Sequence, residues 1–520
     1  MFMVNNTDII ICVHNGLSLV KECLEAAAAN SGNCRLIIVD DNSHKATKDY
    51  LISFSLRHQC TLIENLDTLG YEKSAQKGIA ASFSQSIILL DSQTVVRAGW
   101  LKDLFAYADF DHTIFFGFER SCFKVKEETL KEIDLFKGKI NSAVMGLLDK
   151  SILFLLPTLG GSGGAHTVVQ EIIALREYGL NVKAATFKSY SESFLFHHPK
   201  ANDFLFTFGQ ENDEELQRIS GGFGIVIATN YKSVRYLKKI VDNRPEVIPM
   251  YYIQDHEPWF FPQGDLRRVE AEQSYTLIPD IACFAYSGWL CKIVKELYGI
   301  EAAKIEPCLD RTIFNRYSEA NINIRGPVRI TAMVRPATSV RSPKETLRIL
   351  KIIKRKYKDK VDIRTFGCSD EELDRLDESR GFRFINLGGL KRPQVAEVLK
   401  GSDIFIDASE YQAFGFTGLE AMASGSAAVL PKDCGTGEYA KDRKNSLLVD
   451  TRDINQVVSA VETLICDRGL LARIKEEGVK TARFYSLNKA IRSRIMLFNS
   501  ILTKDKFIEE NSGERIKQAC

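Results

Sequence analysis

The sequence lacks the patterns that would place it in a membrane or cross-link it with disulfides. None of its runs reaches the roughly 18 apolar residues that a membrane-spanning helix needs. The apolar run Ile9-Ile-Ile-Cys-Val13 is too short for a signal peptide. Its twelve cysteines show neither CxxC pairs nor regular spacing, which indicates reduced thiols without a zinc site. We therefore expect a cytoplasmic protein, either soluble or peripheral at the inner face of the membrane.

An excess of either charge is also missing. The chain has 69 basic and 67 acidic residues, a formal net charge of +2, and no acidic tail. This balance argues against nucleic acid as a partner. The apolar fraction of 45% and the charged fraction of 26% are those of a globular protein. A length of 520 residues is enough for about three domains.

One stretch, residues 409–425, organises the rest of the chain. Strand-like runs precede it at 402–408 and follow it at 426–430, and residues 415–423 read as a helix with small residues near its start. A strand, a glycine turn and a helix N-terminus leave backbone N–H groups free to bind an anion. Glu420, one turn into the helix, can accept hydrogen bonds from sugar hydroxyls. By itself this pattern favours an ordinary βα unit of a parallel sheet with a solvated glutamate.

The same stretch resembles the signature of family 4 glycosyltransferases, which are retaining enzymes with two Rossmann-like domains (the GT-B fold). Phe414-Gly415 and Glu420-Ala-Met-Ala-Ser-Gly425 match, but the family's first glutamate falls on Gln412. An amide still hydrogen bonds a hydroxyl, although it cannot stabilise developing positive charge. The resemblance implies that these side chains, together with Thr417, bind a nucleotide-sugar donor.

Basic residues follow the first strand of the same domain, at 328–334. Family 4 enzymes neutralise the donor diphosphate here with an arginine and a lysine. Arg335 matches the first, and Arg341 is the best candidate for the second, with Lys344 behind it. Guanidinium groups bind phosphate oxygens bidentately and stay charged. The resemblance therefore implies turnover without a metal or other cofactor, although solvated surface charge is the simpler explanation of the basic residues alone.

A glycine-rich turn comes earlier, between a strand at 152–156 and a helix predicted over 167–178. Gly163 and Gly164 lie in this turn, where backbone approaches a phosphate or sugar closely. A glycine-rich loop alone is weak evidence. The turn and the segment 179–182 resemble the N-terminal loop of family 4 enzymes, which implies a second donor-binding element.

Three ionisable residues, Asp255, His256 and Glu257, follow the strand 247–253. Ligands of parallel sheets bind at such carboxyl ends. The stretch 251–262 resembles an element of WsaF-type rhamnosyltransferases, a subgroup of family 4. This implies catalytic roles for Asp255 and Glu257 and dTDP-L-rhamnose as the first choice of donor. His256 falls on a variable position of the element, but many family 4 enzymes have an active-site histidine near this point, which makes His256 the third catalytic candidate. Without the resemblance, the stretch is a polar loop anchored by aromatic residues.

The N-terminal part resembles the first half of single-domain (GT-A) family 2 glycosyltransferases. The matching pieces are residues 38–43, 65–71 and 90–96 with 99–101. The second aspartate of that family's metal-binding Asp-x-Asp falls on Gln93, and an amide is a poor ligand for Mg²⁺ or Mn²⁺. The resemblance stops near residue 104, so we expect a truncated, non-catalytic domain. Asp40 and Asp41 could hold a nucleotide, but a strand-end turn is the plainer interpretation.

The predicted fold class is α/β: a GT-B unit preceded by a partial GT-A-like Rossmann-type domain. The predicted parts are a truncated family 2 domain (1–105), a helical linker (106–148), the GT-B acceptor-side domain (149–325), the donor domain (326–503) and a flexible tail (504–520).

The predicted function is a retaining transfer of L-rhamnose from dTDP-L-rhamnose to a cell-surface polysaccharide, glycan or lipid-linked glycan, in association with the membrane or other transferases. Three alternatives stay open. They are a family 4 transferase of another UDP- or GDP-sugar, a non-catalytic glycan-binding partner of another transferase, and a sugar-nucleotide 2-epimerase.

Overall fold

A computed structural model describes residues 7–101, 114–116, 147, 150–311, 313–314 and 326–503, except for single residues at 33, 83, 85, 178, 483 and 486. The predicted linker 106–148, apart from 114–116 and 147, and the tail 504–520 lie outside the described residues. The chain forms two compact units, 1–142 and 143–520.

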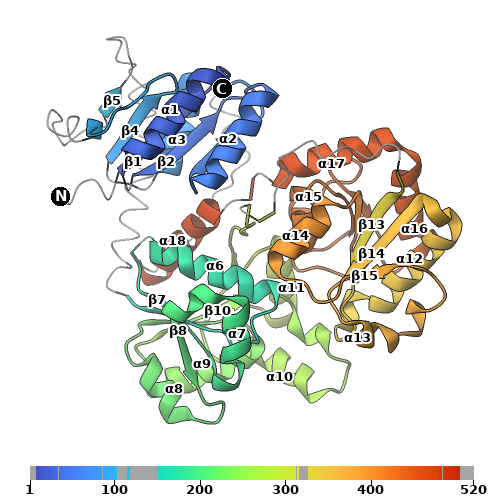
Figure 1. The fold of residues 1–520 in the computed structure, drawn as a ribbon. Helices are drawn as coiled ribbons and strands as arrows, with labels where there is room; N and C mark the ends of the chain where they lie inside the picture. The colour runs from blue at the N-terminus through green and yellow to red at the C-terminus, as the bar shows by residue number, and fades with distance from the viewer. Residues whose placement is uncertain are drawn as a thin grey trace. The chain divides into compact units, whose positions relative to one another are not determined.

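The first unit contains a parallel sheet with the strand order β3-β2-β1-β4-β5 (Figure 1). All seven residues of β1 are buried, as expected for a central strand covered on both faces. The fifth strand, β5, lies beyond residue 105, where the first domain was predicted to end. The sequence did not indicate this strand, because three residues are too few to show a recognisable period. The elements are β1 (Thr7–Val13), α1 (Leu17–Asn30), β2 (Arg35–Asp40), α2 (Lys45–Arg57), β3 (Thr61–Glu64), α3 (Tyr71–Ala81), β4 (Ser86–Asp91) and β5 (Ile114–Phe116).

The second unit begins with a seven-stranded parallel sheet of order β12-β11-β10-β9-β6-β7-β8. Its central strands β6 and β9 are fully buried runs of apolar residues. The strands are β6 (Ile152–Leu155), β7 (Val182–Phe187), β8 (Leu205–Phe208), β9 (Ile225–Ala228), β10 (Ile248–Ile253), β11 (Ala282–Ala285) and β12 (Ala302–Lys304). The helices are α6 (Gly163–Glu177), α7 (Ser191–His197), α8 (Asp213–Ser220), α9 (Tyr231–Asn243), α10 (Leu266–Ser274) and α11 (Gly288–Tyr298), with a 3-10 turn, η4 (Glu257–Phe260).

A second Rossmann-like sheet follows, with the order β15-β14-β13-β16-β17-β18. The chain runs from β13 to one edge of the sheet and then returns to the other side of β13, so the order reverses between β13 and β16. The strands are β13 (Val328–Met333), β14 (Val361–Phe366), β15 (Ile385–Asn386), β16 (Ile404–Ile406), β17 (Ala427–Pro431) and β18 (Leu447–Val449). The helices are α12 (Pro343–Tyr357), α13 (Asp370–Asp374), α14 (Arg392–Lys400), α15 (Phe416–Ala423), α16 (Ile454–Cys466), α17 (Arg468–Ala482) and α18 (Leu487–Thr503).

The last helix, α18, crosses back to the first sheet of this unit. Arg494 on α18 forms an ion pair of 2.6 Å with Glu171 on α6, and their side chains are 1% and 0% exposed. The same guanidinium donates to the hydroxyl of Tyr252 at 2.7 Å. Because one apolar cluster includes residues of α6, α15 and α18, the two Rossmann-like domains share a core.

The predicted α/β class is confirmed, with three parallel sheets. One boundary differs in a way that matters for the site: α6 begins at Gly163, not at residue 167. The two glycines therefore form its first turn instead of a preceding loop. Among the described helices, none combines the length and apolar character needed to cross a membrane.

Candidate functional site

The carboxyl ends of β13 and β16 form the topological switch point of the second Rossmann-like sheet, where ligands of open α/β sheets bind. The loops that follow these strands, 334–342 and 407–415, hold five of the residues singled out in the sequence: Arg335, Arg341, Gln412, Phe414 and Gly415. The geometry of these two loops decides which predicted residues come together.

Arg335 is half-buried in the loop after β13, and its guanidinium has no hydrogen bond or ion pair within the described part of the chain. Burial lowers the pKa of Arg335, and the nearby charge of Arg341 lowers it further, whereas Glu420 and Asp407 work in the opposite direction. A buried cation without a protein partner is costly unless a ligand supplies the counter-charge. Arg335 is therefore arranged to meet an anion.

Arg341 has partners on both sides of the cleft between the two Rossmann-like domains. Its guanidinium forms an ion pair of 2.5 Å with Asp255 and donates to the backbone oxygen of Tyr411 at 2.8 Å. Burial works against the cation, but the charge of Asp255 leaves the pKa of Arg341 raised. The predicted donor-binding arginine and the predicted catalytic aspartate thus pair directly.

The turn into α15 depends on glycine at position 415. Gly415 has a φ of 89°, and a Cβ there would lie 2.9 Å from side-chain atoms of both Thr436 and Tyr439. Phe414 beside it is buried in an aromatic cluster. Thr417, in the first turn of α15, is half-buried. Phe414 therefore supports the turn from inside, whereas the first turn of α15 stays partly accessible.

Glu420 projects from α15 and is only 2% exposed. Both of its carboxylate oxygens accept hydrogen bonds from Arg392, the first residue of α14. The guanidinium of Arg392 also lies 4.6 Å from the ring centre of Phe314, which belongs to the first Rossmann-like domain. The predicted hydroxyl acceptor is therefore already held in place by a fixed cation.

Gln412 is nearly buried, at 9% exposure, and its side-chain amide donates to Asp407 at 2.7 Å and to Ser409 at 3.1 Å. Asp407 was not singled out in the sequence, although its position directly after a buried strand is a signal that could have found it. Its carboxylate lies close enough to act on the pKa of both Arg335 and Arg341.

A second feature that sequence reasoning left unassigned is the contact made by Glu438. Its carboxylate accepts the backbone N–H of Gly288, at the start of α11, at 2.7 Å and pairs with Lys304 at 3.0 Å. An acidic group at a helix N-terminus is favourable. Glu438 thus joins the two Rossmann-like domains.

Gly163 and Gly164 lie at the N-terminus of α6, opposite the end of β10. A Cβ at position 164 would lie 2.2 Å from the side-chain oxygen of Gln254, so a larger residue would require that side chain to move. That oxygen is buried and accepts no hydrogen bond in the described residues. At Gly163 the space around a Cβ is open within 4 Å. Close packing therefore explains Gly164, and Gly163 remains an open approach to the backbone.

His256 and Glu257 face the interior rather than the cleft. His256 is 1% exposed, accepts or donates at 2.9 Å to the Tyr298 hydroxyl and packs edge-on against Trp259. Burial lowers the pKa of His256 to about 4, so the ring is neutral near pH 7. Glu257 accepts the N–H of Tyr231, the first residue of α9, at 2.6 Å. The structure thus brings neither side chain to Arg335.

Lys344 does not share the contacts of Arg335 and Arg341. It is exposed on the first turn of α12, where its charge helps to lower the pKa of Glu378. It forms no ion pair with the residues of the 407–415 loop in the described chain.

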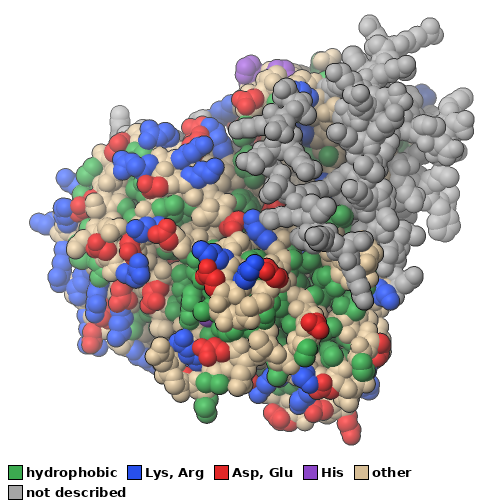
Figure 2. Space-filling model, turned by 180° about the vertical axis from the view of Figure 1, so that it is seen from behind, with side chains coloured by type: hydrophobic (Ala, Val, Ile, Leu, Met, Phe, Trp, Pro, Cys, Tyr) green, Lys and Arg blue, Asp and Glu red, His purple; other side chains and the backbone are tan. Residues whose placement is uncertain are grey.

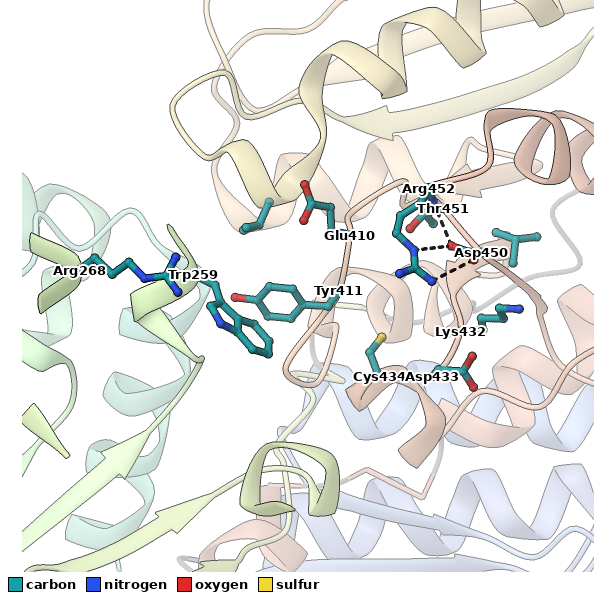
Figure 3. A pocket seen from close by; sticks show the side chains of 12 residues that line it. Trp259, Arg268, Glu410, Tyr411, Lys432, Asp433, Cys434, Asp450, Thr451 and Arg452 are labelled. Atoms are coloured by element: carbon teal, nitrogen blue, oxygen red, sulfur yellow. Dashed lines mark hydrogen bonds and ion pairs between the residues drawn. The ribbon is translucent and has the colours of Figure 1, made fainter. Parts of the chain in front are cut away.

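A cavity of about 500 Å³ opens along the carboxyl ends of β16, β17 and β18 (Figure 3). Trp259 and Tyr411 stand side by side at one end of it, with ring centres 5.0 Å apart. Arg452 pairs with Asp450 on the opposite wall at 2.9 Å. Its lining balances three basic and three acidic side chains: Arg268, Lys432, Arg452, Glu410, Asp433 and Asp450. Such a mixed lining with an aromatic wall suits a neutral polyhydroxyl ligand better than an anion.

In the first unit the strand-end carboxylates are used by the protein itself. Burial acts to raise the pKa of Asp41, but hydrogen bonds from the N–H groups of Leu69 and Gly70 and from Asn65, all at 2.8 Å, hold it below its usual value. Asp40 is fully buried, and burial raises its pKa. Both residues therefore belong to strand-end turns.

At the position of the family 2 metal motif, the carboxylate is again used within a turn of the protein. Asp91 accepts the backbone N–H of the exposed Gln93 at 2.8 Å. No group of three His, Cys, Asp or Glu side chains in the described ranges is arranged to hold a metal ion.

Two family models match the chain. Residues 318–481 match "Glycosyl transferases group 1", and residues 8–156 match "Glycosyl transferase family 2". The family 2 match runs past residue 104, where the resemblance was predicted to stop. The rhamnosyl subgroup is not distinguished by either match.

Curated relatives are similar over short stretches. The chain is 27% identical over 150 residues to a D-inositol 3-phosphate glycosyltransferase of Corynebacterium urealyticum, covering 28% of this chain and 34% of that protein. It is 31% identical over 90 residues to the lipopolysaccharide core biosynthesis glycosyltransferase LpsE of Rhizobium meliloti, covering 17% and 25%. The chain therefore spans about a third or less of the length of these relatives.

Solved structures similar to the chain establish its fold. HepE of Anabaena, solved in complex with UDP and glucose, superposes with a TM-score of 0.54 at 14% identity, covering 66% of this chain and 98% of HepE. Sucrose-phosphate synthase of Thermosynechococcus elongatus gives 0.54 at 14% identity, covering 68% and 100%. These likenesses confirm the GT-B fold. The chain thus has a region that matches the family 2 model, followed by a GT-B unit that contains the region matching the group 1 model, and both matches support the predicted class of enzyme.

Proposed function

We propose that the chain transfers a sugar from a nucleotide-sugar donor to a glycan acceptor, with retention of configuration, in the cleft of its GT-B unit. The observation that supports this most directly is Arg335, a half-buried guanidinium without a protein partner, beside Arg341 at the switch point. Two guanidiniums there match the charge of a diphosphate leaving group. Preorganised charge at the leaving group lowers the barrier without a metal.

In this proposal the Arg341–Asp255 ion pair is the state before donor binding. The donor diphosphate offers Arg341 a second anionic partner, which frees Asp255 to face the donor sugar. Glu420, held by Arg392, presents its remaining lone pairs to the ribose hydroxyls. The first turn of α6 at Gly163 and that of α15 at Thr417 supply backbone N–H groups.

The cavity beside Tyr411 fits the acceptor. Its aromatic wall and balanced charges suit the C–H faces and hydroxyls of a neutral glycan. Polysaccharide or lipid-linked glycan synthesis is the proposed setting, because the similar protein LpsE is a glycosyltransferase of lipopolysaccharide core biosynthesis.

For the donor, dTDP-L-rhamnose is the first candidate because residues 251–262 resemble the rhamnosyl subgroup. A UDP-sugar is the second, because HepE, a structural neighbour, was solved with UDP and glucose. The test is release of nucleoside diphosphate from dTDP-rhamnose, UDP-glucose, UDP-GlcNAc and GDP-mannose, with an added glycan acceptor. Release from dTDP-rhamnose alone supports the first candidate, and release from a UDP-sugar supports the second. Binding of a donor without release under any condition would make the chain a non-catalytic partner, and isomerised free donor would make it an epimerase.

A further inference from the structure

Position 412 carries an amide where the group 1 signature has a carboxylate, and the structure shows what that amide contacts. Gln412 Nε2 lies 2.7 Å from Asp407 Oδ2, at the end of β16. The other carboxylate oxygen, Oδ1, accepts the backbone N–H of Ser409 at 3.0 Å and its hydroxyl at 2.5 Å. Each side of Asp407 thus faces donors.

These contacts settle which way the amide of Gln412 points. Only its NH₂ group can donate to a carboxylate, so its carbonyl oxygen is turned away from Asp407. Within the described chain that oxygen accepts no hydrogen bond. The residue Gln412 keeps 9% of its surface exposed. It is available to a hydroxyl donor in the cleft.

The negative charge that the signature's first glutamate would supply at position 412 is present here on Asp407. Asp407 is 8% exposed and acts electrostatically on both Arg335 and Arg341, which places its charge beside the two guanidiniums. A glutamate at 412 would bring two carboxylates into hydrogen-bond contact, where they cannot both ionise without a large penalty.

We propose that Asp407 and Gln412 act as one unit in place of the signature's first glutamate: Asp407 supplies the negative charge, and Gln412 presents an acceptor oxygen to a hydroxyl of the donor sugar. Asp407 is a positioning residue, because it acts through Gln412 and through the field at the arginines. The inference deepens the proposed function and rests on it.

The test is a four-chain cycle of wild type, Asp407→Asn, Gln412→Glu and the double variant. Asp407→Asn leaves an NH₂ group facing either Ser409 or Gln412, so donors oppose each other. Gln412→Glu opposes two carboxylates. The double variant restores the hydrogen bond between positions 407 and 412 and one negative charge, now at position 412; only the longer contact from position 412 to the Ser409 hydroxyl, 3.1 Å in the wild type, is not restored.

Donor turnover is measured as nucleoside diphosphate release, together with thermal unfolding of all four chains. Each single variant is expected to lose about ten-fold or more in kcat, and the double variant to return to within about three-fold of wild type. Gln412→Glu is further expected to regain activity relative to wild type from about pH 8 to about pH 6, because one proton shared by the two carboxylates restores a donor. A purely structural role would not produce this pH dependence.

Asp362→Asn is the matched control, because Asp362 lies near the amino end of β14 in the same sheet and also pairs with an arginine, Arg364, at 2.9 Å. It should keep wild-type turnover. If Asp407→Asn unfolds, the comparison of Gln412→Glu with the double variant decides. Turnover in the wild type with a double variant no better than Gln412→Glu would overturn the inference alone. Failure of the wild type on every donor would instead overturn the proposed function, and the inference with it.

Discussion

Both units of the chain place charged side chains at the carboxyl ends of parallel strands, but they use them differently. In the first unit Asp41 receives two backbone N–H groups and an amide, so it stabilises its own turn. In the second unit Arg335 lies at the end of β13 without a protein partner in the described residues. A charge that the fold satisfies needs no ligand, whereas one that the fold leaves unpaired does.

The surface agrees with this local view of charge. Basic and acidic side chains are interspersed over the face shown in Figure 2. Net charge therefore says little about the ligand, and the partners of individual side chains say more.

The comparison is tested most directly at Arg335. Arg335→Ala should lower turnover by about a hundred-fold or more, because it removes the positive charge that stabilises the leaving diphosphate. Nucleoside diphosphate release measures it, with circular dichroism to check the fold. Arg329→Ala, near the amino end of the same strand, is the control and should stay near wild type. Near-normal activity of Arg335→Ala would end the assignment.

The second unit also contains a buried ion pair, Arg494 with Glu171, whose charges stabilise the fold, in contrast to the unpaired Arg335. Arg494→Met should lower the free energy of unfolding by about 3–5 kcal/mol, because Glu171 is left as a buried, unpaired carboxylate. Arg494→Met with Glu171→Met should lose less, since neither charge remains. Urea unfolding measures both. Equal losses in the single and double variants would show that the ion pair does not decide the stability.

Glu257 gives a smaller, pH-dependent effect. Burial raises its pKa from the ordinary 4.5 to about 8. Between these two pH values, Glu257 is therefore protonated in the folded chain and ionised in the unfolded chain. Stability should therefore fall as the pH rises from about 4.5 to about 8. Glu257→Gln cannot lose that proton, so its melting temperature should fall by a few degrees less than that of wild type between pH 5.5 and pH 8. The exposed Glu211→Gln is the control, and parallel curves for all three chains would contradict the assignment.

The smallest effect is expected in the first unit. Asp91→Asn, and separately EDTA, should leave turnover within about two-fold of the untreated wild type, because Gln93 offers no carboxylate for a divalent ion. Nucleoside diphosphate release with the preferred donor measures both. Loss of turnover in EDTA would move the chemistry to the family 2 region and reverse the comparison.

The buried strand runs were enough to predict the α/β class, and the signature residues 409–425 implied the GT-B unit through their resemblance to family 4 glycosyltransferases. The α/β class follows from the local period of these runs, which a single sequence displays. The short β5 and the start of α6 were not predicted, because a three-residue strand has no period and helix ends are set by packing.

The candidate site divides in the same way. Arg335 and Glu420 could be picked out by their position after a strand and within a helix. The sequence could not show that Arg341 pairs with Asp255, that Glu257 faces α9, or that His256 is buried among aromatic rings.

By itself, then, the sequence determined the order of strands and helices, the glycine at 415 and the residues available at the strand ends. The tertiary structure decided which of those charges are paired and which are free. The reason is physical: a hydrogen bond or ion pair joins atoms far apart in the chain, and burial sets its strength. Asp407 and Gln412 lie only five positions apart, yet even their pairing depends on how the loop after β16 turns back.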